Sequence, residues 1–209
     1  MASTTAAEDV AGLWLLTLQR AVGRASHDVK DALNGVSVNL EVIRSRSARA
    51  EVPASAVAKF GDAAAQQLDR LTTLLDAVLA LARADRSPAD VAVTLRRVVT
   101  MCAASSSSAD AQVSFVGEAE TGVALTRVPV DVLRLALMAP LLDVVTGVNR
   151  ALQLSPVTCT MDVDHEWVRV VISAGGRQGA IPEALADVLR GAGVRWTEGE
   201  NLSLAFPRA

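Results

Sequence analysis

Cysteine and histidine are both scarce in this sequence: each occurs twice in 209 residues. Cys102 and Cys159 are too few for a disulfide framework or for a Cys-rich four-ligand zinc site. We therefore expect reduced thiols that pack as small apolar side chains. A His-rich metal site is excluded in the same way, so His27 and His165 have to be weighed one at a time.

An excess of positive charge and a long apolar run are missing too. The formal net charge is −3, which leaves nucleic-acid binding without electrostatic support. No apolar run approaches the ~20 residues that span a bilayer. The first ten residues, MASTTAAEDV, lack the basic-then-apolar order of a signal peptide. We expect a cytoplasmic protein that binds neither nucleic acid nor a membrane.

The first part of the chain, residues 1–86, has the pattern of a helical hairpin. One long helix is predicted over 8–49 and a second over 57–84, with a polar loop broken by Pro53 between them. Each helix has an apolar stripe at spacings of three and four, made of Val29, Leu33, Val36, Leu40 and Ile43 in the first and Phe60, Ala64, Leu68, Leu71, Leu75 and Val78 in the second. Two helices alone cannot cover both stripes. We therefore predict a homodimer that forms a four-helix bundle.

Residues 87–209 form the second predicted domain and mix short strands with helices. Helices are predicted over 91–104, 130–150 and 182–190, and strands over 112–117, 123–128, 157–163, 167–173, 194–197 and 202–206. This order is typical of an α+β sandwich, in which helices cover one face of a mostly antiparallel sheet.

His27 is the residue on which a chemical role can be based. At about 100° per residue, Leu33 and the rest of its stripe lie within about 40° of Val29, whereas His27 lies near 160°, on the opposite face. Four polar residues are expected on the same outer face as His27: Arg20, Arg24, Asp31 and Asn34.

An exposed imidazole beside carboxylates has the make-up of a nucleophile. Asp28 follows His27 directly and Asp31 lies one turn further on, and either carboxylate could orient one ring nitrogen while the other attacks a phosphoryl group. The plain alternative is that His27 is one more polar residue on a solvated helix face.

The residues around His27 favour the chemical reading. Residues 26–35, SHDVKDALNG, resemble the H-box of sensor histidine kinases, which opens the first helix of a helical hairpin. The resemblance implies that His27 is the phospho-acceptor and Asp28 its adjacent acid. Ala32 stands where the family often has proline, a departure that affects a helix kink more than the chemistry.

The second domain resembles the ATP-binding (Bergerat) domain of the same family, with its nucleotide site lost. Ala139 and Asp143 stand where the family has two asparagines that hold magnesium, and Ala174 replaces the aspartate that reads adenine. Ile181-Pro182-Glu183 fits the family pattern, but the glycine-rich lid that covers the phosphates, about 30 residues or more, is missing. We expect no cofactor of the chain's own, although Asp143 could still hold a cation.

An intact acceptor helix beside a lost ATP site predicts a histidine phosphotransferase of a multistep phosphorelay. The resemblance implies that receiver domains of response regulators, and possibly a hybrid histidine kinase, dock beside His27 and supply their own Mg²⁺. Arg20, Arg24 and Asn34 would then contact the partner. An ATP-dependent sensor kinase and a non-catalytic signalling scaffold are the alternatives.

Two further features have less specific interpretations. His165 lies among acidic residues, which can indicate a metal site, but a polar hairpin tip is the favoured interpretation. Arg96 and Arg97, like the cluster Arg44, Arg46 and Arg49, are either part of a solvated face or contacts to an acidic partner.

Overall fold

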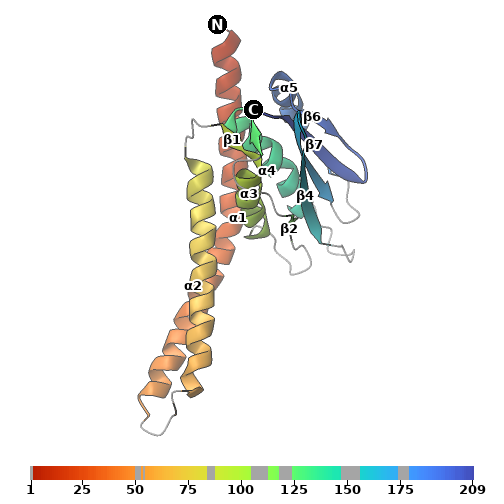
Figure 1. The fold of residues 1–209 in the computed structure, drawn as a ribbon. Helices are drawn as coiled ribbons and strands as arrows, with labels where there is room; N and C mark the ends of the chain where they lie inside the picture. Colours follow the sequence, from red (N-terminus) through yellow and green to blue (C-terminus); the bar gives the residue numbers. More distant parts are fainter. Residues whose placement is uncertain are drawn as a thin grey trace.

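The N-terminal half is a helical hairpin. The computed structural model describes residues 2–49, 53, 55–83, 88–104, 113–117, 124–146, 156–173 and 179–209. Helices α1 (Ala2–Ser47) and α2 (Ser55–Ala82) lie side by side and run antiparallel (Figure 1), which confirms the predicted hairpin. Neither these nor the other described helices are long and apolar enough to cross a membrane.

A mixed α/β part follows. Its elements are β1 (Ala89–Asp90), α3 (Val91–Ala104), β2 (Val113–Val116), β3 (Leu125–Thr126), α4 (Val130–Thr146), β4 (Val157–Val163), β5 (Trp167–Ser173), α5 (Glu183–Gly191), β6 (Arg195–Thr197) and β7 (Asn201–Pro207). Within the described residues, five strands form one sheet in the order β2-β4-β5-β7-β6. The β2–β4 pair is parallel and the other pairs are antiparallel. The predicted α+β sandwich is thus confirmed.

The strand predicted over 123–128 is largely wrong. Val123 lies outside the described residues, and of residues 124–128 only Leu125 and Thr126 form a strand, which pairs with β1 and not with the main sheet. The flanking Ala124 and Val128 are both fully or nearly fully buried, so the apolar residues of this segment pack into the core from a short connection. The Thr126 hydroxyl donates a hydrogen bond to the carbonyl of Pro207, which fixes that connection to the end of β7.

The sheet buries one face against the helices. Alternate residues of the central strands point into the core, namely Val168, Val170 and Ile172 of β5 and Leu202, Leu204 and Phe206 of β7. In Figure 1, α3 and α4 lie between this sheet and α1. The helical hairpin is therefore packed against the helix layer and not against the strands.

The hairpin and the α/β part share one continuous hydrophobic core. Ala21 and Ala25 of α1, and Leu74, Ala77 and Leu81 of α2, belong to the same buried cluster as the apolar faces of α3 and α4. Alanine on α1 lets the backbones of neighbouring helices approach closely. Two domains divided at residues 86 and 87 stay a prediction, since residues 84–87 lie outside the described residues.

The apolar stripe predicted as the core seam of α1 is only partly covered within the chain, since Val29, Val36 and Ile43 are half-buried. Leu33 and Leu40 are 46% and 54% exposed, while Ala21, Ala25 and Ala32 are buried. The alanine face, rather than Leu33 and Leu40, is buried against the rest of the chain, because α1 packs against α3 and α4 as well as α2. Large apolar side chains therefore remain exposed on the hairpin surface.

A buried arginine of the α/β part forms hydrogen bonds with the end of the helical hairpin. Arg134 of α4 has a side chain only 3% exposed. Its Nη1 donates to the carbonyl of Arg83 at 2.8 Å, and its Nη2 donates to that of Ala80 at 3.2 Å. These carbonyls lie at the C-terminal end of α2, where no further turn of helix satisfies them and where the helix dipole favours a cation.

Candidate functional site

His27 stands on the outer side of α1 with its imidazole in solvent. Its side chain is 83% exposed, as the helical phase predicts. The neighbouring Ala25 is buried against the core, so the same turn of helix supports a reactive group on one side and the packing on the other. A partner protein can therefore reach the imidazole without any opening of this chain.

Asp31 is the carboxylate that contacts the imidazole. Its Oδ2 lies 3.0 Å from Nδ1 of His27, one helical turn along α1. A proton on Nδ1 is donated to this carboxylate, which leaves the lone pair of the ring on Nε2. In this tautomer Nε2 is the nucleophilic atom, on a side chain that is largely exposed.

Asp28 has a different partner. Its Oδ2 accepts a hydrogen bond from Nη2 of Arg70 at 2.6 Å, and its side chain is only 25% exposed. Arg70 belongs to α2, so this ion pair joins the two helices of the hairpin. Of the two acids considered for orienting His27, the structure places Asp31 on the imidazole and Asp28 on Arg70.

The other residues expected beside His27 are not all brought to one surface. Arg24 and Asn34 are exposed on α1. Arg20 instead donates from Nη2 to Oδ1 of Asp143 on α4 at 3.0 Å. Arg20 was expected to meet a partner, but α4 packs against this part of α1 and supplies a carboxylate within the chain.

The two positions matched to the metal-binding asparagines of the nucleotide site are Ala139 and Asp143, both on α4. Ala139 is buried, and Asp143, the remaining acid, is ion-paired with Arg20. A hollow of about 540 Å³ lies here between α1, α4 and α5, and it is lined mostly by apolar side chains and by no carboxylate. Ala174 lies outside the described residues. The chain passes from α5 to β6 through Ala192, Gly193 and Val194 alone.

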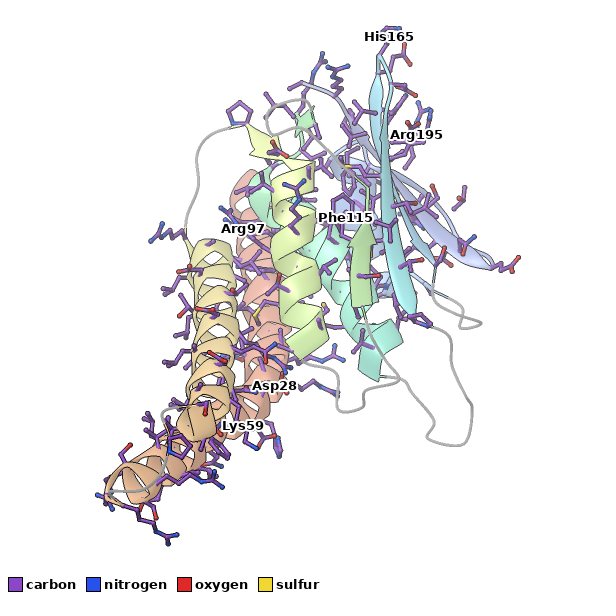
Figure 2. The ribbon with its side chains drawn as sticks, turned by 60° about the horizontal axis from the view of Figure 1, so that its bottom comes forward. Asp28, Lys59, Arg97, Phe115, His165 and Arg195 are labelled. Carbon is purple, nitrogen blue, oxygen red and sulfur yellow. The ribbon has the colours of Figure 1, made fainter. Side chains whose placement is uncertain are left out.

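His165 lies at the tip of the β4–β5 hairpin (Figure 2). The carboxylate of Asp164 accepts hydrogen bonds from the N–H groups of Glu166 and Trp167 and pairs with Arg169. These contacts, the backbone hydrogen bonds foremost, lower the pKa of Asp164. Among the described residues, no group of three or more His, Cys, Asp or Glu side chains is arranged to hold a metal ion.

The two cysteines are buried free thiols, as predicted. Burial raises the pKa of Cys159 to about 12 and raises the pKa of Cys102 further. Since the thiolate is the reactive form, neither residue is a nucleophile at neutral pH.

Sequence reasoning missed Arg70 and Arg134. Arg70 is 42 residues from Asp28, and Arg134 is 51 residues from the carbonyl of Arg83. Arg134 sits in the apolar run of α4, and a lone arginine in such a run was the one available signal that it needed buried acceptors.

No protein-family model matches the chain, and a search of curated proteins finds no match. Among solved structures, the chain is similar to the histidine kinase domain of the blue-light activated histidine kinase of Erythrobacter litoralis EL346. The identity is 16% and the TM-score 0.42, with 90% of this chain and 94% of that chain covered.

The chain is also similar to full-length ShkA in complex with AMPPNP, at 18% identity and a TM-score of 0.37. Here 91% of this chain is covered but only 45% of ShkA, so the chain spans less than half of that protein.

Proposed function

We propose that this protein is a histidine phosphotransferase of a multistep phosphorelay, which carries a phosphoryl group between receiver domains on His27. The observation that supports this most is the geometry at His27: an imidazole open to solvent, with Nδ1 within hydrogen-bond distance of Asp31. The H-box resemblance of residues 26–35 points to the same residue.

The transfer needs little from this chain beyond that geometry. Nε2 attacks the phosphorus of a receiver's phospho-aspartate, the N–P bond forms, and the acyl phosphate P–O bond breaks to release the receiver's carboxylate. The ring becomes a phospho-imidazolium, which keeps its Nδ1 proton, and the Asp31 carboxylate at 3.0 Å offsets its positive charge. Transfer to a second receiver reverses these steps.

Mg²⁺, when bound by the receiver, would neutralise the charge on the transferring phosphoryl oxygens. The residues of this chain supply the nucleophile, its tautomer and its exposure.

The test uses a panel of purified receiver domains phosphorylated with labelled acetyl phosphate. Wild-type protein should acquire a label that is labile in acid and stable in base, as expected of phosphohistidine. His27→Ala should acquire none, while circular dichroism shows the fold intact, because the side chain is outside the core.

His165→Ala is the matched control and should be labelled as the wild type is. Label on His27→Ala would show that the phosphoryl group goes elsewhere. Absence of label on the wild type with every receiver would favour the scaffold alternative.

A further inference from the structure

Two hollows run end to end along the seam between α2 and α3. The one nearer His27 is about 350 Å³ and reaches Asp28 and Arg70, and the other is about 380 Å³ and reaches Arg83. Thr73 and Thr100 line both, so the hollows form one groove. Arg70 lies on α2 and Arg83 directly follows its last residue, 13 positions further on, which makes the groove about 20 Å long at 1.5 Å per residue.

The groove concentrates positive charge on a protein that is acidic overall. Its charged lining residues are Arg70, Arg83, Arg96 and Arg97 against Asp28 and Asp76. Four cations and two anions give the groove a net charge of +2, whereas the whole chain has −3. Charge segregation of this kind steers an oppositely charged partner.

Of the four arginine side chains that line the groove, two contact partners within the chain and two have none among the described residues. Arg70 is paired with Asp28, and Arg96 lies over the ring of Phe115. The side chains of Arg83 and Arg97 have no partner among the residues that the structure describes. Arg97 extends from α3 toward α2 (Figure 2).

The two hydroxyls of the groove are already used as donors. Thr73 donates to the carbonyl of Asp69, and Thr100 donates to that of Arg96. The donors left for an occupant are therefore guanidinium N–H groups, which suit carboxylates in a two-point hydrogen-bonded geometry.

We propose that this arginine groove docks an acidic face of the protein that exchanges its phosphoryl group with His27. The inference rests on the proposed function and names the surface by which the partner is recognised. The groove begins at Asp28, the residue next to His27, so a partner bound over the imidazole lies within reach of it. The cations are spread over about 20 Å, the length of a 13-residue helix, and are not gathered around one point.

A single small anion is a poorer match for the same residues. Asp76 lines the hollow that holds Arg83 and Arg97, and its carboxylate would repel a phosphate there. An extended acidic surface can place its carboxylates on the arginines at either end and leave Asp76 facing solvent. We therefore assign the groove to a protein partner.

The experiment measures phosphotransfer kinetics from the receiver that labels wild type fastest, at several salt concentrations. Arg83→Glu/Arg97→Glu should lower kcat/KM by about tenfold at low salt, through a higher KM, and should flatten its salt dependence. The final amount of label at saturating receiver should stay the same, because His27 is untouched. Arg83→Gln/Arg97→Gln should give a smaller change of the same sign, and serves if the glutamates disturb folding.

Arg127→Glu is the matched control, because Arg127 is exposed and lies outside the groove. A fall in kcat/KM that is the same in this control, or an unchanged KM and salt dependence in the groove variants, would overturn the proposal.

A second measurement does not depend on phosphotransfer. Fluorescence anisotropy of a labelled, glutamate-rich helical peptide should show binding to the wild type at low salt and weaker binding to the groove variants. Peptide binding without any phosphotransfer would contradict the proposed function but would still support the groove as a docking site for an acidic surface. Phosphotransfer that does not depend on the groove arginines would support the proposed function and contradict the docking role of the groove.

Discussion

At the residue scale, the two aspartates near His27 have separate roles. Asp31 contacts Nδ1 of the imidazole, whereas Asp28 is held by Arg70 and is turned toward α2. The first acid can fix the tautomer and offset the charge of a phospho-imidazolium. The second stabilises the packing of the hairpin by an amount typical of a partly exposed ion pair, about 0–1 kcal/mol.

Substitution of the two aspartates by asparagine should separate these roles. Asp31→Asn should lower the rate of phosphotransfer by about ten- to a hundredfold, because the imidazole loses its orienting carboxylate. Asp28→Asn should leave the rate within a few-fold of wild type and lower the free energy of unfolding by about 1 kcal/mol or less. Rapid-quench kinetics and urea unfolding measure the two effects, and an equal loss of rate in both variants would contradict the assignment.

Asp164 predicts how stability depends on pH. Its pKa is lowered in the folded state from the ordinary value of 3.8, so the unfolded chain takes up a proton first as the pH falls. The stabilisation from its contacts is therefore fully present above that value and is lost as the pH falls through the lower, folded-state pKa.

Asp164→Asn should reduce the dependence of stability on pH in acid. Urea midpoints between about pH 7 and about pH 2 should fall less steeply for this variant than for wild type. Asp187→Asn, at an exposed carboxylate that pairs with Arg190 on the same helix, is the control. An unchanged acid profile for Asp164→Asn would show that its contacts do not contribute.

At the scale of elements, Arg134 of α4 holds the end of α2. Arg134→Met keeps most of the volume of the side chain but leaves two part-buried carbonyls without their donors, so the free energy of unfolding should fall by about 1–3 kcal/mol. Arg127→Met, at an exposed site, should change it by about 0.5 kcal/mol or less. Urea unfolding measures both, and similar values for the two variants would contradict the role of Arg134.

The contact between α1 and α4 bears on nucleotide binding. Arg20 of α1 forms an ion pair with Asp143 of α4. The residues that line the hollow between α1, α4 and α5 include no carboxylate that could bind a metal. Isothermal calorimetry with MgATP should therefore show no binding up to about millimolar concentration. Micromolar binding, with label from γ-labelled ATP appearing on the purified protein, would revive the kinase alternative.

At the scale of the whole molecule, the hairpin exposes large apolar side chains to solvent. They include Leu33 and Leu40 on α1 and Leu68, Leu75 and Leu79 on α2. Several large apolar side chains left exposed on one helical hairpin are typical of a protein interface. A second copy of the hairpin, with the same exposed side chains, would bury them in a four-helix bundle.

Leu75→Glu should therefore dissociate the dimer and leave the monomer folded. Leu75 is 47% exposed within one chain, so a glutamate is tolerated there, but in a bundle it would be buried without a partner. We expect dimerisation to weaken by about a hundredfold or more.

Multi-angle light scattering against concentration measures this, with Val116→Glu on β2 as the exposed control outside the hairpin. A monomeric wild type at micromolar concentration would remove the prediction. Leu71, which the sequence placed on the same stripe, is half-buried beside Asp28 and Arg70 and is a poorer test.

Local patterns in the sequence were enough to predict most of the elements and the exposure of His27. The spans 91–104, 157–163 and 167–173 coincide with α3, β4 and β5. The angular position of His27 on α1 follows from 3.6 residues per turn, whatever the helix packs against. Such features depend on residues close in sequence, so periodicity and turn residues suffice.

Which helix faces are buried and which distant residues form ion pairs was decided by the tertiary structure alone. Periodicity located one apolar stripe on each helix of the hairpin but could not tell that α1 buries its alanine face within the chain and leaves Leu33 and Leu40 exposed. Arg70 reaches Asp28 across 42 positions, and Arg20 reaches Asp143 across 123. An ion pair requires only that two charged atoms come within a few ångströms, and nothing in the local sequence records which distant charge will arrive there.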